Sequence, residues 1–363
     1  MEGLVIGLDL NDDYSQISCN EKEKSWTVPT VICRRKEKET WLIGEEAYAA
    51  TLLGEGVIVD KLLKMVRKEG TSTIGGICYT GTDLLKIFLK KLLDCPFKEF
   101  HTDQVEQLVI TMHGTDAKVT DCLMYCADYL NIPRDRVHVI SHTESFAYYV
   151  LSQRKELWSN QVGLFELSED RLCYYEMKVQ RGMRRSMVQA EAQNQEEAFD
   201  LDILDSPSGS KLADQILCSC GEKLLENKLF STVFLTGKGF ERQDWATGFM
   251  KLACNRRRVF VENVLFSKGA AIKARDYMVQ GTEFPYVFVC EGRLKAEVAL
   301  KVMRAGKEIM LAVASYGDNW YESKSSLELI LDGQKEIEFL ISHLDSRKKR
   351  AVSVLGIGDR HLI

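Results

Sequence analysis

The 363-residue chain lacks any long apolar run and any long basic block. No window approaches the ~20 uninterrupted apolar residues of a membrane-spanning helix, so the sequence predicts no membrane partner. The basic clusters are only three or four residues long and the net charge is −5, which is not the electrostatic footprint of a nucleic-acid binder. Membrane insertion and nucleic-acid binding are therefore excluded from the expected functions.

The chain also lacks a compact cysteine framework, because its 11 cysteines are scattered without short, even spacing. The N-terminus begins a strand at once, without the charged start and apolar segment of an export signal. Both features lead us to expect a cytoplasmic protein. Cys122 and Cys126 share a helical face, and Cys218 and Cys220 do not, but no second pair stands at zinc-ribbon spacing. We interpret all four as packing residues and expect no metal site.

Hydrophobic residues make up 45% of the chain and charged residues 28%, which indicates a globular protein of two or three domains. Strand patterns at 4–10, around Ile17, at 28–33 and at 40–43 precede a helix from Gly44. Leucines and Phe88 at three- and four-residue intervals predict another helix, which Thr82 or Asp83 could cap.

Strand and helix then alternate, which favours a parallel sheet with crossover helices. Residues 161–193 begin a second run of three strands as the first run began, so the sequence predicts an internal duplication. An acidic linker at about 195–210 is followed by the second set of helices and strands. From about residue 283 only short strands are expected, and they follow one another in this order: 286–290, 297–303, 308–315, 326–332, 336–342 and 351–357.

The motifs VIGLDLNDDYSQIS, GLFELSEDRLCYY and VFLTGKGF stand in the order of two phosphate hairpins and an adenosine loop. In this order the chain resembles the superfamily of actin, the heat-shock chaperones and the sugar kinases, and its chaperone branch most. The resemblance implies an α/β, two-lobed actin-like ATPase fold with duplicated ribonuclease-H-like lobes. It implies lobe I at residues 1–150, a reduced lobe II at 151–280 and a small all-β, sandwich-like C-terminal domain at 281–363.

The same resemblance implies eight cofactor-binding positions, although several depart from the family pattern. These are Asp9, Asn11, Asp12, Glu166, Ser168, Gly237, Lys238 and Gly239. Asn11 stands in place of a glycine, and Asp12 and Asp13 stand in place of threonines. At the second tip Ser168 replaces a glycine, and Glu169 and Asp170 replace a glycine-threonine pair. Asparagine tolerates a left-handed turn, so we expect the first hairpin to form.

Acidic tips are difficult to reconcile with a triphosphate, since two like charges ~4 Å apart repel by about 1 kcal/mol in water and about 4 kcal/mol at an effective dielectric of 20. Asp9, Asp12 and Asp13 could instead hold a hard cation through oxygens, or Asp12 and Asp13 could form a solvated tip. The catalytic glutamate of the chaperones falls at Ser141 or His142, with Glu144 displaced.

His113 and His142 follow strands, at the sheet edge where open α/β sheets bind ligands, so either could act as a general base. The sequence shows no nucleophile or acid partner for them. We expect no catalytic residue and no required cofactor. The function expected is a non-catalytic protein-interaction module with a protein or peptide partner and weak or no ATP binding. The alternative is a chaperone-like ATPase that uses the acidic hairpin residues with Mg.

Overall fold

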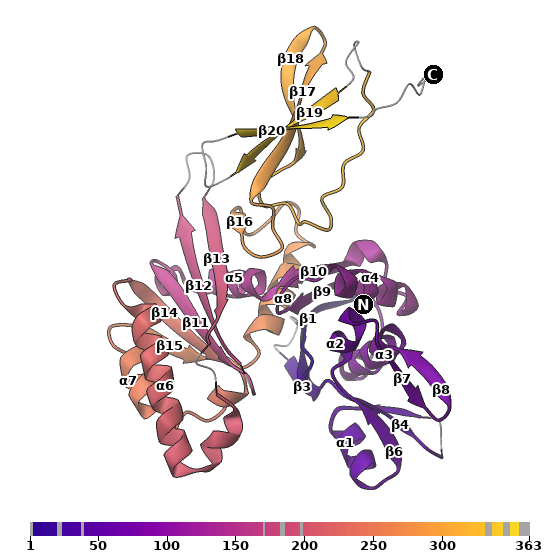
Figure 1. Ribbon diagram of the computed structural model, residues 1–363, viewed down its shortest axis with the longest axis vertical. Coiled ribbons are helices and arrows are strands. Elements are labelled where there is room, and N and C mark those ends of the chain that lie inside the picture. The colour runs from indigo at the N-terminus through magenta and orange to yellow at the C-terminus, as the bar shows by residue number, and fades with distance from the viewer. Residues whose placement is uncertain are drawn as a thin grey trace.

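A computed structural model describes residues 3–19, 24–37, 40–169, 171–181, 186–196, 199–330, 336–343 and 349–355. Asp170 lies outside the described residues. The α/β class and the all-β C-terminal region expected from the sequence are both confirmed (Figure 1). Within these residues no helix is long and apolar enough to cross a membrane.

The first sheet has the strand order β10-β9-β1-β2-β3 and is built from the N-terminal part of the chain. Its strands are β1 (Leu4–Leu10), β2 (Tyr14–Cys19), β3 (Lys24–Pro29), β9 (Val105–Met112) and β10 (Val137–Ser141). The β1–β2 and β2–β3 pairs are antiparallel, whereas β9 runs parallel to both β1 and β10. Every residue of β1 is buried, as expected for a strand whose sheet is covered on both faces.

The second sheet repeats this order as β15-β14-β11-β12-β13, with β16 added at its edge. Its strands are β11 (Gln161–Leu167), β12 (Leu172–Gln180), β13 (Met187–Asn194), β14 (Phe230–Thr236), β15 (Arg258–Val261) and β16 (Val287–Val289). The directions also match those of the first sheet, since β11, β12 and β13 alternate and β14 and β15 are parallel to β11. The repetition predicted from the sequence is therefore visible in the topology.

The helices surround the two sheets (Figure 1). They are α1 (Gly44–Leu52), α2 (Leu62–Arg67), α3 (Gly81–Phe100), α4 (Ala117–Tyr129), α5 (His142–Ser152), α6 (Pro207–Leu225), α7 (Thr247–Ala253) and α8 (Leu265–Asp276). The α3 helix begins with a capping box between Thr80 and Asp83, so the N-cap expected at Thr82 or Asp83 was wrong by two or three residues.

Two helices cross between the sheets. The α5 helix leaves the first sheet and contacts β13, whereas α8 leaves the second sheet and contacts β1 and β9. They approach so closely that a Cβ on Gly269 would lie 2.0 Å from the carbonyl oxygen of Ser145. A Cβ on Gly7 of β1 would lie 2.1 Å from the carbonyl oxygen of Ser267. Glycine at both positions therefore lets α8 join the two halves of the molecule.

The part of the chain that contains the first sheet also has shorter strands: β4 (Ile32–Arg35), β5 (Trp41–Ile43), β6 (Gly56–Val59), β7 (Thr71–Ile74) and β8 (Ile77–Thr80). The single strand expected at 28–33 is divided between β3 and β4. Pro29 ends β3 in a tight turn, in which the Val31 N–H donates to the Pro29 carbonyl oxygen at 2.8 Å.

The C-terminal sheet has the order β18-β17-β19-β20 and projects away from the two other sheets (Figure 1). Its strands are β17 (Ala296–Arg304), β18 (Lys307–Ala314), β19 (Glu336–His343) and β20 (Lys349–Leu355). The strand expected at 326–332 is absent over its described residues 326–330. The strand expected at 286–290 is β16, which pairs with β13 of the second sheet and not with the C-terminal sheet.

Candidate functional site

The tips of the β1–β2 and β11–β12 hairpins face each other across a small cavity of about 120 Å³. The residues that line it are Leu10, Asn11, Asp12, Asp13, Tyr14, Leu63, Arg67, His113, Ser168 and Arg171. The structure thus brings Asn11 and Asp12, implied by the resemblance, to the same cavity as Ser168. Ligand pockets for drug-sized molecules usually measure about 300–1,000 Å³, so this cavity is small for a nucleotide.

The first hairpin forms, but without the left-handed asparagine that we expected. Leu10 pairs with Ser15, which leaves a four-residue loop, and the backbone of Asn11 has no positive φ. Loops of this length are commonly built around right-handed turns, so no left-handed residue is needed. The Asn11 side chain instead donates from Nδ2 to Oδ1 of Asp9 at 3.1 Å.

The two aspartates at the first tip are not a solvated pair. Asp12 Oδ1 accepts hydrogen bonds from the backbone N–H groups of Leu63 at 2.7 Å and Lys64 at 3.2 Å. Asp12 also lies 3.8 Å from Arg67, and Asp13 forms an ion pair with Lys61. The segment from Lys61 to Arg67 therefore supplies partners for both carboxylates, and Asp9 takes no part in these contacts.

Glu166 at the end of β11 is buried and is held by groups of its own hairpin. The Tyr175 hydroxyl donates to its Oε2 at 2.6 Å, and Arg171 Nη2 donates to its Oε1 at 3.0 Å. The Ser168 hydroxyl lies 3.4 Å from the same Oε1. Burial alone would raise the pKa of Glu166, but Arg171, His142 and Tyr175 outweigh it and the pKa lies below its usual value.

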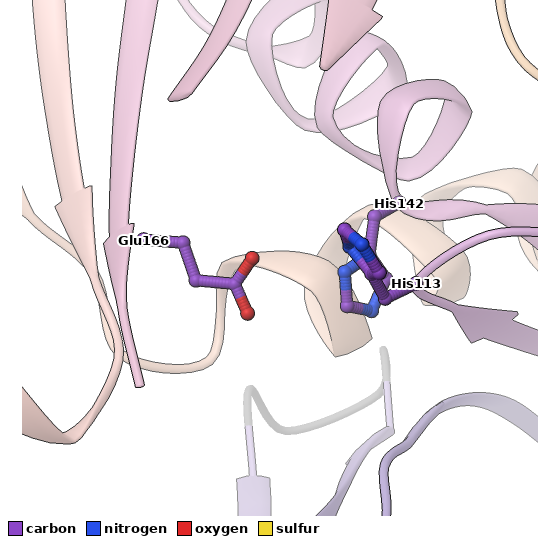
Figure 2. A group of neighbouring side chains, drawn as sticks. All are labelled: His113, His142 and Glu166. Carbon is purple, nitrogen blue, oxygen red and sulfur yellow. The ribbon is translucent and has the colours of Figure 1, made fainter. Parts of the chain in front are cut away.

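A chain of side chains connects the two sheets at this point, and Figure 2 shows two of its members, His142 and Glu166, on facing sides. His142 Nε2 lies 2.7 Å from Asp9 Oδ1, with both side chains buried. His142 Nδ1 lies 3.3 Å from the Tyr175 hydroxyl, which in turn donates to Glu166. Asp9 and His142 belong to the first sheet and its following helix, whereas Tyr175 and Glu166 belong to the second sheet. The protein's own side chains therefore span the space between the hairpins.

Two further rings fix this network. Phe266 of α8 stacks on His142, with ring centroids 3.8 Å apart. His113, which follows β9, directs Nδ1 at the Tyr175 hydroxyl from 3.3 Å. Burial lowers the pKa of His113 to about 4, so its imidazole is neutral at neutral pH. Burial raises the pKa of the Asp9 carboxyl despite the nearby His142.

The three residues expected in the adenosine loop pack against the second hairpin. Gly237 has φ +94°, and a Cβ there would lie 2.5 Å from the carbonyl oxygen of Leu167. A Cβ on Gly239 would lie equally close to the Leu167 side chain. Lys238 forms an ion pair with Glu169, whose hydrogen bond raises the lysine pKa. This loop therefore contacts the hairpin tip directly, and its lysine is already paired with a carboxylate.

Of the residues around the start of α5 that could correspond to the chaperones' catalytic glutamate, one faces the space between the hairpins. His142 does so, whereas the Ser141 hydroxyl caps the helix and donates to the carbonyl oxygen of Glu291 at 2.8 Å. Glu144 is buried against the other side and forms a bidentate ion pair with Arg293. Glu144 thus fastens the chain that leads to the C-terminal sheet and lies away from the hairpins.

Three further residues complete this site: Arg171, Tyr175 and Lys61. Little in the sequence indicates their roles. Tyr175 ends a run of four buried residues in β12, where a buried aromatic side chain is expected for packing alone. Lys61 precedes a helix of only six residues. An arginine directly after the acidic pair Glu169-Asp170, as at Arg171, was the one available signal of a hairpin that neutralises its own carboxylate.

Comparison with known protein families identifies the chain by two models. Residues 13–291 match a family of unknown function, DUF5716, in its C-terminal part, and residues 293–357 match a domain of unknown function, DUF8552. No curated protein matches the chain. The first match covers most of the chain, so the protein belongs to the DUF5716 family.

Proposed function

We propose that this protein is a non-catalytic relative of the actin, heat-shock chaperone and sugar kinase superfamily, closest to its chaperone branch. The matching strand order of the first and second sheets supports the two-lobed fold, and so does the crossing of α5 and α8 between them. The eight positions implied by the resemblance also gather around the two hairpins or pack against them. The proposed function follows from the side chains that occupy the space between the two hairpins.

The observation that carries the proposal is the side-chain chain from Asp9 through His142 and Tyr175 to Glu166. In an ATP-dependent relative, the nucleotide would connect the lobes at this position. Here four protein groups connect them, and the cavity left beside these groups is about 120 Å³. A triphosphate would have to displace buried, hydrogen-bonded groups, which costs about 1–3 kcal/mol for each neutral group left unpaired and more for each charge. The lobes are joined without ATP, which binds weakly or not at all.

The acidic tips do not support the alternative ATPase. That function requires Asp12 and Asp13 to hold a metal ion for the phosphates. Instead the backbone N–H groups of α2 donate to Asp12, and Lys61 forms an ion pair with Asp13. An incoming Mg²⁺ would have to break these contacts before it could bind either carboxylate.

The C-terminal sheet is the part we propose for partner binding. It is joined to the rest through the Arg293–Glu144 ion pair, the Tyr321 hydroxyl bond to the Val139 N–H at 2.6 Å and the Asn319 bond to the Val139 carbonyl. Its outer strands are β18 and β20. Outer strands have backbone groups that an extended peptide can pair with, as in peptide-binding β domains. The proposed partner is an extended segment of a cytoplasmic protein.

Thermal unfolding of the purified chain with and without Mg-ATP tests the proposal. A ligand at a hundredfold excess over its Kd stabilises the folded state by about 2.7 kcal/mol, which is readily visible as a shift in Tm. We expect no shift at millimolar Mg-ATP. A clear increase in Tm that requires both Mg²⁺ and ATP would contradict the proposal and favour the ATPase.

A further inference from the structure

Four side chains of types that bind metal ions converge between the two sheets, and three of them belong to the chain of side chains that joins the hairpins. His113, His142 and Glu166 each offer a donor atom, and these atoms all lie within 4.8 Å of one another. The phenol oxygen of Tyr175 lies among them, 3.3 Å from each histidine Nδ1 and 2.6 Å from Glu166 Oε2. Figure 2 shows the two imidazoles side by side, with the Glu166 carboxylate directed toward them from the facing strand.

The contacts of these side chains fix which of their atoms face one another. The His142 Nε2 atom lies 2.7 Å from Asp9 Oδ1, so the Nδ1 atom of the same ring is the one that faces the Tyr175 oxygen. The Tyr175 hydroxyl donates to Glu166 Oε2 from the facing strand. Two imidazole nitrogens, a phenol oxygen and a carboxylate oxygen therefore surround one point between the sheets.

Two of the distances between donor atoms match those around a tetrahedral metal ion. Bonds of about 2.0–2.1 Å from zinc to nitrogen or oxygen place neighbouring ligands about 3.3–3.4 Å apart. Both histidine-to-Tyr175 distances are 3.3 Å. The shorter Tyr175–Glu166 distance is a hydrogen bond, and it lengthens once the phenol proton leaves for solvent and both oxygens bind the metal. The His142–Asp9 contact is the carboxylate-to-histidine bond that commonly orients a metal-bound imidazole.

We propose that His113, His142, Glu166 and Tyr175 bind one divalent transition metal ion of the zinc class. The charges then balance, since Asp9, Glu166 and the Tyr175 phenolate carry three negative charges and the metal ion with Arg171 carries three positive ones. Arg171 bonds to Oε1 of Glu166, which leaves Oε2 for the metal. The cavity of about 120 Å³ borders half-buried His113 and provides the way in.

This site goes beyond the proposed function, because protein groups alone hold the ion and no nucleotide takes part. Its test is therefore run without ATP. Metal-free full-length chain is titrated with Zn²⁺ in competition with a chromogenic chelator. Cys78 and Cys254 are exposed thiols, and cysteine sulfur is a zinc ligand, so both are changed to serine in every sample. We expect one ion per chain.

The deciding variant is His113→Gln, since His113 is the least buried of the four side chains and the change keeps a polar group there. We expect zinc affinity to fall by at least about 10- to 100-fold, the loss that even an outer-shell partner causes. His138→Gln is the matched control, because His138 lies on β10 but bonds to Glu322 and stacks on Tyr277. Its zinc affinity should equal that of the parent.

A second measurement guards against a variant that misfolds. Co²⁺ in place of Zn²⁺ should give the intense visible absorption of a tetrahedral site, and Tyr175→Phe should shift or abolish that absorption while the far-UV spectrum is unchanged. The proposal is overturned if the parent binds no stoichiometric zinc. It is equally overturned if His113→Gln and Tyr175→Phe both bind metal as the parent does.

Discussion

The two hairpins occupy equivalent places in two sheets of the same strand order, yet they neutralise their acids in different ways. The first relies on a separate segment, since Lys61 and the start of α2 hold Asp13 and Asp12. The second relies on itself, since Arg171 and Tyr175 of the same hairpin hold Glu166. Equivalent hairpins in a repeated fold therefore need not neutralise their carboxylates with equivalent partners.

Burial explains the difference. The side chains of Lys61 and Asp13 are 49% and 32% exposed, whereas Glu166 is only 4% exposed beside an Arg171 at 30%. An exposed carboxylate is stable without a partner, because water solvates it. A buried carboxylate requires a cation or a hydrogen-bond donor as soon as it leaves water. The next strand of the same hairpin is the nearest part of the chain that can supply one. The second hairpin should therefore be far more sensitive to loss of its cation.

The largest expected effect is that of Arg171→Met, which leaves the Glu166 charge buried without its cation. Removing one partner of a buried ion pair costs about 3–5 kcal/mol, and the partial exposure of Arg171 reduces this to about 2–3 kcal/mol. Urea denaturation at pH 7 measures it. The double variant Glu166→Gln/Arg171→Met should recover much of the loss, and a single variant as stable as the wild type would contradict the comparison.

The next effect is that of Tyr175→Phe, measured in the same way without added metal. It removes the hydroxyl that donates to Glu166 at 2.6 Å, and a buried acceptor left unpaired costs about 1–3 kcal/mol. Tyr174→Phe is the control on the same strand, because its hydroxyl donates to the partly exposed Glu176, where water can replace it. Equal losses in the two variants would show that Glu166 does not depend on Tyr175.

A pH dependence comes third, from the His113 ring that faces Tyr175. Its folded pKa of about 4 lies below its usual 6.5, so the unfolded chain binds more protons between these values. The neutral ring thus contributes stability above pH 6.5 that is lost as the pH falls toward 4. Between pH 7 and pH 5 we expect His113→Gln to lose less stability than the wild type, by on the order of 1 kcal/mol. Parallel losses in both proteins would contradict this pKa.

The smallest effect belongs to the first hairpin. Lys61→Met removes an ion pair between two partly exposed side chains, and such pairs contribute about 0.2–1 kcal/mol. Added salt should reduce even this difference, because it screens exposed charges. Urea denaturation at low and high salt checks both expectations. A loss as large as that of Arg171→Met would remove the contrast between the hairpins.

The sequence predicted much of the fold, because apolar periodicity reports directly on buried strands and helix faces. β1, the α3 helix and the repeated strand order follow from such patterns. Predictions from the sequence were wrong where a local interaction overrode the apolar pattern. The tight turn after Pro29 and the capping box at Thr80 are two such interactions. The strand expected at 326–332 had the right alternation but no pairing partner over its described residues.

The site was predicted in its positions and not in its contacts. Asp9 and Glu166 were named because the resemblance to the actin, chaperone and sugar kinase superfamily implies cofactor-binding residues at both positions. Their partners could not be read, since Asp9 and His142 are 133 residues apart and meet only when the sheet forms. Tyr175 has the pattern of a core residue, and only its hydrogen bond to Glu166 on the neighbouring strand reveals its polar role. Pairings between distant residues require the fold, which no local pattern encodes.

Hydrogen exchange at the two hairpins tests the central claim most directly, namely that protein side chains already fill the place of a nucleotide. Peptides that cover residues 4–19 and 161–180 would be followed by mass spectrometry with and without saturating Mg-ATP. We predict the same exchange in both hairpins under both conditions. Slower exchange in both hairpins on addition of Mg-ATP would show that a nucleotide binds between them and would contradict this account.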